Sequence, residues 1–156
     1  REALIKLRYH RIAEAFLVNV MGFGWHEIHE EAQHMSNGLS ETLVQRMSEM
    51  AGNPSHCPHG EPIPTADGHM PEVRDIWLTE ADPARDYVVS RVHSHDDDKL
   101  QYLDQLGLKP GVKFHLLDRA PFEGPLRLRI GEETHFIGHT LAGVLRVCDE
   151  DEFELV

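Results

Sequence analysis

The sequence has few cysteines and no long apolar run, and each shortage excludes a class of protein. Its 156 residues include two cysteines, Cys57 and Cys148, which lie far apart. Two distant cysteines make no disulfide framework, so we expect a protein of the reducing cytoplasm. No apolar stretch is long enough to cross a membrane, and the chain does not open with a secretory signal, so we expect no membrane partner.

Basic residues are also in short supply. The chain has 15 Lys and Arg against 27 Asp and Glu, a net charge of −12. Such a surface repels phosphate, so we do not expect these residues to hold DNA themselves. The 12 histidines are many for this length, and histidine is the commonest transition-metal ligand near neutral pH. From composition alone, an acidic surface kept for solubility is the favoured explanation of the charge.

Familiar catalytic patterns are absent from the sequence. No set of nucleophile, histidine and acid stands out, and there is no glycine-rich phosphate loop. We therefore expect that the chain is not an enzyme and that it binds no small organic ligand.

The first part of the chain has the periodicity of helices. Helices are predicted from Arg1 to about Met21, from Trp25 or His26 to Asn37, and from Glu41 to Met50. Ser40 is a good N-cap and Gly52 a good C-cap for the third helix. That helix and its approach carry an apolar face of Leu39, Leu43, Val44 and Met47, which we expect to form the symmetric interface of a homodimer.

The second part changes character after a proline-rich segment. Four prolines and a glycine among residues 53–64 exclude regular structure there. Strands are predicted at Tyr87–Val92, Val112–Leu117, Leu126–Ile130, Thr134–Ile137 and Leu141–Val147, and a short helix at Lys99–Leu106 closed by Gly107. Several short strands indicate a small barrel. The predicted class is α+β, with a helical domain at 1–65, a linker at 66–77 and a β domain at 78–156.

One group of residues in the helical part can carry metal chemistry. His10 and Glu14 are four apart on the first helix and project from the same face. His29 lies at the edge of the apolar stripe of the second helix, so packing of the two stripes would bring the three together. Two imidazoles and a carboxylate suit Mn, Fe, Co, Ni or Zn. The alternative is a solvated pair that holds no metal.

The remaining candidates have a structural interpretation. Cys57 with His56 and His59 could bind metal, but the spacing matches no zinc pattern, so we favour a structural role. Cys148, near the end of a strand, is expected to be a small buried hydrophobe.

Several segments resemble one known family. Residues 9–17 (YHRIAEAFL) and 28–32 (IHEEA) resemble segments of the diphtheria-toxin-repressor family of iron- and manganese-dependent regulators. Residues 57–64 (CPHGEPIP) are similar to that family's proline-rich exit from the dimerisation domain. Residues 106–111 and 119–126 resemble its C-terminal SH3-like domain, which is shared with a ferrous-transport accessory protein. The resemblance implies a three-helix metal-binding and dimerisation domain followed by a small SH3-like β-barrel.

The resemblance also implies a set of metal ligands. The family's ancillary site corresponds to His10, Glu14 and His29 here. A further acidic ligand, from the residues before the short helix of the SH3-like domain, corresponds to Asp96. Asp97 or His95 are alternatives for it, because an insertion would shift the alignment. The acidic run also has a structural explanation, since carboxylates at a helix N-terminus favour the helix dipole.

The chain departs from the family at the primary metal site. The matching positions hold Gln33, Ser36 and Asn37, none of which is a strong ligand for Mn or Fe. A carbonyl of Gln33 or Asn37 would bind weakly. The primary site is therefore expected to be degenerate or built differently, with His10, Glu14 and His29 as the principal site.

The resemblance implies a function as well. Binding of Mn(II) or Fe(II) would promote operator binding by a homodimeric repressor, through an N-terminal winged helix-turn-helix that we expect to be missing from this chain. We favour manganese, because the expected ligands are histidines and carboxylates. The alternative is a metal-binding transport-accessory or sensor module with no DNA-binding function.

Overall fold

The computed structural model describes residues 2–153, which form two compact units. The first comprises residues 2–73 and is helical, and the second comprises residues 74–153 and contains the sheet. The predicted α+β class is confirmed. None of the helices within residues 2–153 is both long and apolar enough to cross a membrane.

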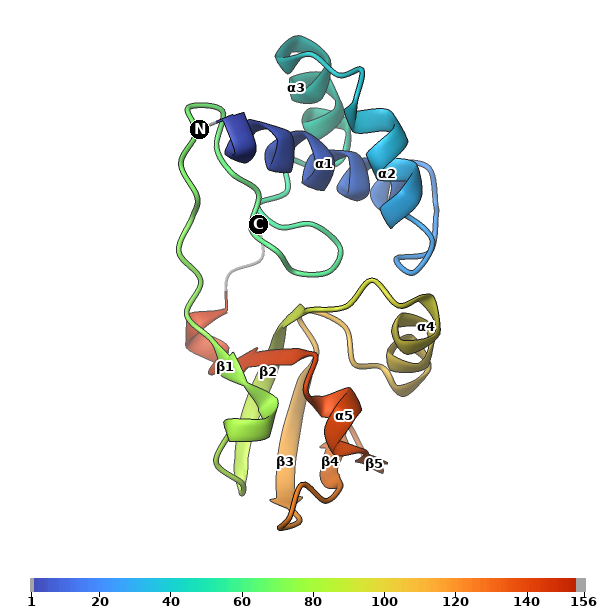
Figure 1. Ribbon diagram of the computed structural model, residues 1–156. Coiled ribbons are helices and arrows are strands. Elements are labelled where there is room, and N and C mark those ends of the chain that lie inside the picture. The colour runs from blue at the N-terminus through green and yellow to red at the C-terminus, as the bar shows by residue number, and fades with distance from the viewer. Residues whose placement is uncertain (1, 154–156) are drawn as a thin grey trace. The chain divides into compact units, whose positions relative to one another are not determined.

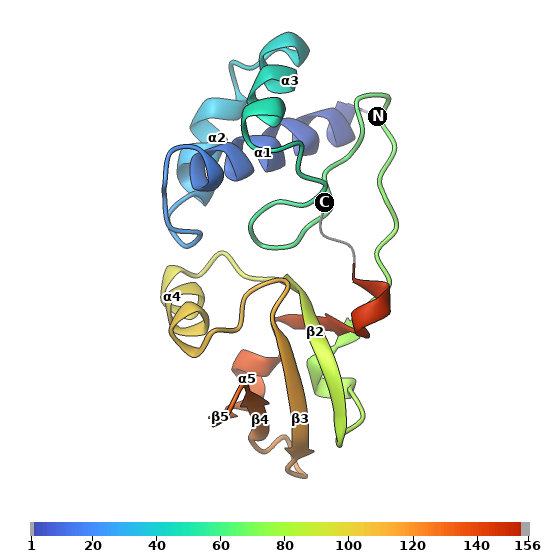
Figure 2. The ribbon, with the colours of Figure 1, turned by 180° about the vertical axis from the view of Figure 1, so that it is seen from behind.

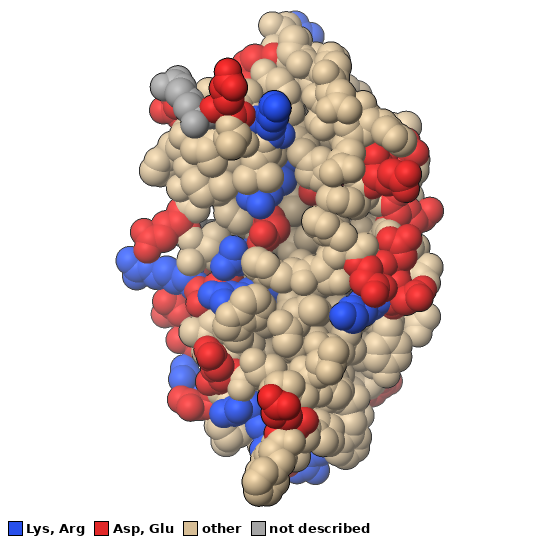
Figure 3. All heavy atoms as spheres, viewed as in Figure 1, with Lys and Arg blue, Asp and Glu red and all other residues tan. Residues whose placement is uncertain are grey.

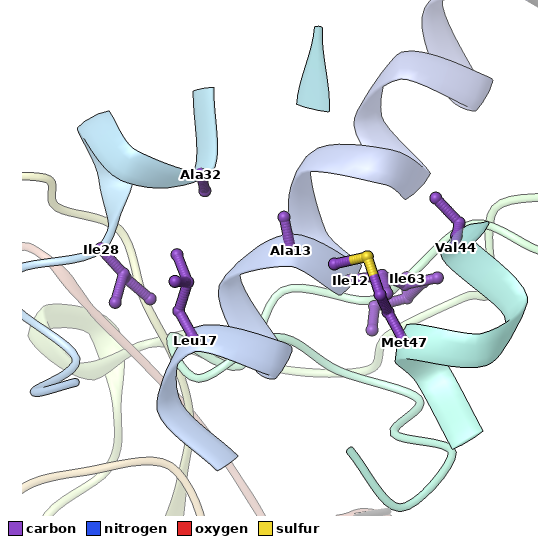
Figure 4. Close-up of a cluster of buried hydrophobic side chains, with 8 residues drawn as sticks. All are labelled: Ile12, Ala13, Leu17, Ile28, Ala32, Val44, Met47 and Ile63. Atoms are coloured by element: carbon purple, nitrogen blue, oxygen red, sulfur yellow. The ribbon is translucent and has the colours of Figure 1, made fainter. Parts of the chain in front are cut away.

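The helical unit is built around its first helix. Its helices are α1 (Glu2–Asn19), α2 (His29–Ser36) and α3 (Glu41–Met50). Helix α1 packs against both of the others (Figure 1). The buried core between them consists of Ile12, Ala13, Leu17, Ile28, Ala32, Val44, Met47 and Ile63 (Figure 4).

That core corrects the predicted interface on α3. Val44 and Met47 are buried inside the helical unit, so they are not free to meet a second copy of the chain. Leu43 remains exposed, as does Met50 one turn beyond Met47. The apolar face of α3 is therefore divided, with one side in the core and the other at the surface.

The ends of α3 were predicted correctly. The Ser40 hydroxyl accepts a hydrogen bond from the backbone N–H of Leu43 at 3.2 Å, as an N-cap does. Gly52 follows the helix with φ of +93°, a conformation that favours glycine.

Helix α2 begins later than predicted, at His29. Residues 24–27 form a turn instead, in which the N–H of Glu27 donates to the carbonyl of Gly24 at 3.0 Å. The carbonyl of the buried Trp25 accepts a hydrogen bond from the ring of His59 at 2.7 Å. A distant side chain therefore bonds a carbonyl that a longer helix would have used internally.

The proline-rich segment after α3 forms a tight loop that returns beside α1 (Figure 2). The N–H of Cys57 donates to the carbonyl of Glu61, and the N–H of Gly60 to the carbonyl of Cys57, both at 2.8 Å. Its only ladder contact among the described residues is an isolated bridge between His56 and Pro62. The predicted lack of regular structure is confirmed apart from that bridge.

The second unit contains one antiparallel sheet in the strand order β1-β6-β2-β3-β4-β5. The strands are β1 (Ile76–Trp77), β2 (Arg85–Val92), β3 (Lys113–Arg119), β4 (Leu126–Ile130), β5 (Glu133–Ile137) and β6 (Leu145–Cys148). Helix α4 (Asp97–Leu106) lies between β2 and β3, and α5 (His139–Ala142) between β5 and β6.

Two local predictions in this unit had different outcomes. The hairpin turn between β4 and β5 is confirmed, since Ile130 pairs with Glu133 and Gly131 has φ of +61°. The predicted strand at 141–147 is wrong in its first half, where α5 ends and β6 has not begun. A short apolar run does not by itself distinguish a buried strand from a buried helical turn.

Candidate metal centre

Helix α1 places His10 and Glu14 one turn apart, and His29, the first residue of α2, faces them. The distance from His10 Nε2 to Glu14 Oε2 is 3.7 Å. The rings of His10 and His29 meet edge to face, with centroids 5.2 Å apart. One donor atom from each of the three residues lies within 4.8 Å of the others. The structure thus brings together the three residues singled out in the sequence, and their binding of a metal stays a prediction.

A second group of donors converges on the same carboxylate. Glu14, Cys57 and His59 also offer donor atoms within 4.8 Å of one another, and all three residues are buried. His59 Nδ1 lies 3.5 Å from Glu14 Oε2. Cys57 and His59 come from the proline-rich loop, so Glu14 stands between two donor groups that are remote in sequence.

The hydrogen bond to Trp25 places a proton on Nε2 of the His59 ring. A backbone carbonyl only accepts, so Nε2 of His59 must carry the proton that it donates at 2.7 Å. In the charged ring, Nδ1 also carries a proton and faces Glu14 as a positive partner, whereas in the neutral ring its lone pair is available to a metal ion. Metal-bound histidines characteristically donate their other ring N–H to a carbonyl or carboxylate in this way, which orients the ring for the ion.

Glu14 is a buried carboxylate that needs a positive partner. Burial by itself would raise its pKa, but the imidazoles of His10 and His59 outweigh that effect and lower the pKa to about 2. Its Oε2 atom has no hydrogen-bond partner among the described residues, because both imidazoles lie beyond hydrogen-bond distance. A buried charge is stable when it is paired or coordinates a metal. Glu14 therefore fits a cation better than it fits the apolar core beside it.

Cys57 is a buried free thiol beside this carboxylate. Burial raises the pKa of the thiol, and the charge of Glu14 raises it further. The thiol is therefore neutral until a cation displaces its proton, as thiolate coordination requires. With an ion present, Cys57 and His59 would supply sulfur and nitrogen, a set that suits Zn, Co or Fe.

Two arginines of α1 hold the loop that carries Cys57 and His59. Arg11 donates to the carbonyl of Pro62 at 2.6 Å and lies 3.6 Å from the carboxylate of Glu61. Arg8, which is buried, donates to the carbonyl of Pro64 at 3.0 Å. The helix that provides His10 and Glu14 thus also fixes the returning limb of the loop.

The positions of the family's primary site have local roles here. The hydroxyl of Ser36 donates to the carbonyl of Gln33 at 3.2 Å, and Asn37 is the C-cap of α2. Gln33 and Asn37 are exposed. Weak coordination by their side-chain carbonyls stays a prediction.

Asp96 belongs to the second unit, where it caps α4. Its carboxylate accepts hydrogen bonds from the N–H groups of Asp98 at 3.0 Å and Lys99 at 3.2 Å. Asp97 is the first residue of that helix, and His95 precedes the cap. This is the helix N-terminus role considered for the acidic run, and metal ligation by Asp96, Asp97 or His95 stays a prediction.

Sequence reasoning considered Cys57 with His56 and His59 as a metal group and disfavoured it because of the spacing. Their separation of two residues is unlike zinc-binding spacings, and the residue that completes the group lies more than forty positions earlier, on α1. The sequence features that could have indicated a metal group were a cysteine and a histidine in a proline-rich turn, and a carboxylate near the apolar stripe of the first helix. Only the return of the loop to α1 reveals that they belong together.

Comparisons with known proteins match the two parts of the chain to two different family models. Residues 1–65 match the family model of the iron-dependent repressor metal-binding and dimerisation domain, and residues 76–147 match the FeoA domain. The chain is 30% identical to the iron-dependent repressor IdeR of Mycobacterium tuberculosis over 158 aligned positions, which cover 93% of this chain and 68% of that protein. It is 27% identical to the diphtheria toxin repressor of Corynebacterium glutamicum, covering 74% of this chain and 55% of that protein.

Solved structures give the same result for the fold. A manganese-dependent transcriptional repressor in complex with manganese matches with a TM-score of 0.88 and 31% identity, over 94% of this chain and 70% of that one. The IdeR of T. acidophilum matches with a TM-score of 0.85 and 31% identity, over 96% of this chain and 68% of that one. With its two domain matches in the same order, this chain belongs to the diphtheria-toxin-repressor family of metal-dependent transcriptional repressors.

Proposed function

We propose that residues 2–73 bind Mn(II) or Fe(II) through donors around Glu14, and that this binding controls a homodimeric repressor. Operator DNA would be bound by a winged helix-turn-helix domain outside these 156 residues. On the face shown in Figure 3, lysines and arginines are interspersed with aspartates and glutamates and form no broad basic surface among the described residues. Together with the net charge of −12, this supports a DNA-reading element elsewhere.

One observation carries the proposal. Glu14 is 3% exposed, and its Oε2 lies within 3.7 Å of two imidazoles without a hydrogen bond. A buried carboxylate in such surroundings is costly unless it meets a cation. The relatives that share this fold include a repressor solved with manganese, which supports a divalent transition metal as that cation.

The mechanism is one of linkage between metal and DNA. The ion would neutralise Glu14 and would be coordinated by donors from α1, α2 and the proline-rich loop, which would hold the three segments together. A ligand shifts an equilibrium only by binding one state better than another. We expect the state with all three segments gathered at Glu14 to be the one competent for the operator, so that metal and DNA each raise the other's affinity.

The test is to replace Glu14. Glu14→Gln keeps the size of the side chain and removes its charge, and Glu14→Ala removes its donors altogether. We expect at least about a 100-fold loss of affinity for Mn(II) by calorimetry, more than changing a residue outside the coordination shell costs. Glu49→Ala, on the exposed side of α3, is the matched control. Affinity equal to that of the unaltered chain in both Glu14 variants would reject the site.

A transport-accessory module is the second candidate, because residues 76–147 match the FeoA domain. The two functions differ in one measurable property. The repressor should retain DNA fragments from a random library only when Mn(II) or Fe(II) is present, with the full-length protein as the bait. Full-length protein that binds metal at Glu14 but retains no DNA would favour the accessory function.

A further inference from the structure

The loop between β3 and β4 exposes an aromatic side chain that the fold does not use. Phe122 is 99% exposed, and this residue and Glu123 have φ of +59° and +56°. Non-glycine residues seldom adopt this left-handed region, and strain of this kind clusters at functional sites, where the surrounding structure maintains it. The loop at the end of β3 (Figure 1) therefore presents Phe122 to the outside in a fixed, strained conformation.

The loop is held closed by its own backbone. The N–H of Ala120 donates to the carbonyl of Pro125 at 3.0 Å, and the N–H of Gly124 donates to the carbonyl of Pro121 at 3.2 Å. A Cβ atom at Gly124 would lie 2.7 Å from that of Ala120, so only glycine allows the two limbs to approach this closely. A side chain on so rigid a loop loses little conformational entropy when it binds.

A hollow of about 320 Å³ lies beside Phe122. Its walls include Arg119 of β3, Leu126 of β4 and His139 of α5, together with Phe122 itself. Pockets for small organic molecules begin at about 300 Å³, so this one suits a group of the size of an aromatic ring. A surface with both an exposed ring and a hollow of that size can bind a copy of itself about a two-fold axis.

We propose that this surface joins two copies of the chain, each placing Phe122 in the hollow of the other. Charges on the surface are complementary for that contact. Glu123 has a side chain that is 81% exposed and lies 3.8 Å from His139 Nε2 of its own chain, beyond hydrogen-bond distance. Arg119 donates to the carbonyl of Thr79 at 2.6 Å, which holds its guanidinium at the wall of the hollow. Insertion of Phe122 would bring the adjacent Glu123 to Arg119 of the other copy, and two-fold symmetry would form that pair twice.

The charge of the whole chain favours a second copy at this surface over other partners. Residues 113–146 contain five Lys and Arg and four Asp and Glu, a net charge of +1, so the remaining residues carry −13. Like charges repel, so two copies of an acidic chain meet most readily where the charge is balanced. Nucleic acid needs a strongly basic surface, and a basic protein would bind the acidic remainder instead.

This contact is expected to be weak and separate from metal binding. One ring and one ion pair from each copy bury less than the roughly 1,200 Å² of a stable complex. A dimer at tens of micromolar through the helical unit is therefore compatible with it. The contact would form at higher concentrations, or between chains that are already held close together, as repressors on neighbouring operators would be under the proposed function.

Sedimentation equilibrium of the full chain between about 20 µM and about 1 mM tests the contact, because mass action favours association as the concentration rises. We expect the weight-average mass at the upper concentration to be at least about twice that at the lower. Phe122→Asn should abolish the rise, since asparagine tolerates positive φ and keeps the loop conformation. Phe136→Thr, which removes an exposed aromatic side chain of β5 outside the hollow, should keep it.

A charge exchange tests the pairing directly. Glu123→Arg and Arg119→Glu each place like charges together and should abolish the rise, whereas an equal mixture of the two variants restores opposite charges and should recover it. Recovery in the mixture also shows that loss of the bond to Thr79 has not unfolded the chain. A constant mass in the unaltered chain, or a rise that survives Phe122→Asn, would overturn the contact. A mixture that stays at the lower mass would overturn the pairing of Glu123 with Arg119. These measurements need no metal, so their failure would leave the proposed function intact.

Discussion

Both ring nitrogens of His59 have defined neighbours, the carbonyl of Trp25 at Nε2 and the carboxylate of Glu14 at Nδ1, although the sequence spacing did not indicate either contact. Because its Nε2 donates to the carbonyl of Trp25, Nδ1 is the ring nitrogen that is left to coordinate a metal ion. We expect the Nδ1 resonance to shift when Zn(II) is added, while Nε2 keeps its proton. Long-range proton–nitrogen NMR of the imidazoles measures both. His34, exposed on α2, should not respond. A proton on Nδ1 of His59 in the zinc-loaded chain would exclude it as a ligand.

Asp75 plays a different part, inside the second unit. Its side chain is fully buried and accepts hydrogen bonds from Arg91 at 2.7 Å and from Arg146 at 2.9 Å. Asp75→Asn would leave two largely buried guanidinium groups without their counter-charge, so we expect a loss of about 3 kcal/mol in the free energy of unfolding. The exposed pair of Asp118 and Arg127 is the control, and Asp118→Asn should cost under about 1 kcal/mol. Urea denaturation followed in the full chain compares the two variants.

The pH dependence of that stability has a definite sign. Burial raises the pKa of Asp75, but hydrogen bonds from Arg91, Ser90 and Arg146 outweigh burial and hold it below the ordinary 3.8. A lowered pKa means that the stabilisation is present above about pH 4 and is lost as the pH falls below it. Asp75→Asn should therefore lack that part of the acid sensitivity. Identical acid unfolding curves in the two chains would contradict this role.

At the scale of elements, the sequence correctly predicted those helices and strands whose caps, apolar spacing and turn residues lie within the element itself or next to it. Helix α3 has its cap, its apolar spacing and its terminal glycine within thirteen residues, and its bounds agree with the prediction. Helix α2 was predicted too long, because the carbonyl of Trp25 bonds to His59 from a distant loop. The site followed the same pattern. His10 and Glu14 lie one helical turn apart and were singled out from the sequence, whereas the position of Cys57 and His59 beside Glu14 depends on the path of the loop.

That loop depends on α1 for its position. Arg11 donates to the carbonyl of Pro62 and pairs with Glu61, in the part of the loop that follows Cys57 and His59. Arg11→Ala should let the limb move and lower metal affinity about 10- to 100-fold, as the loss of a supporting contact typically does. Arg46→Ala, exposed on α3, should leave the affinity unchanged. Competition with a chromophoric chelator measures both. Equal affinities in the two variants would show that the contacts of Arg11 do not position the loop for metal binding.

For the whole molecule, the exposed apolar residues of the helical unit support a homodimer. Leu43 is 48% exposed, Met50 65% and Met21 56%. The side chain of Asn19 donates to the carbonyl of Ala51 at 3.1 Å, which holds the end of α1 against the end of α3. Met21 and Met50 therefore belong to neighbouring helix ends, and with Leu43 they supply an apolar surface that the unit does not cover itself. Exposed patches of this kind mark interaction sites.

A double charge on this surface tests whether it forms the dimer. In a symmetric interface each substitution occurs on both partners, so Leu43→Glu with Met50→Glu would place four carboxylates in one apolar contact. We expect the unaltered chain to be dimeric by light scattering at tens of micromolar and the double variant to be monomeric, with its helix content retained by circular dichroism. Phe136→Glu, which charges an exposed aromatic residue on β5, should remain dimeric. If the double variant is still a dimer, another surface joins the chains, and the exposed side of α3 serves a different contact.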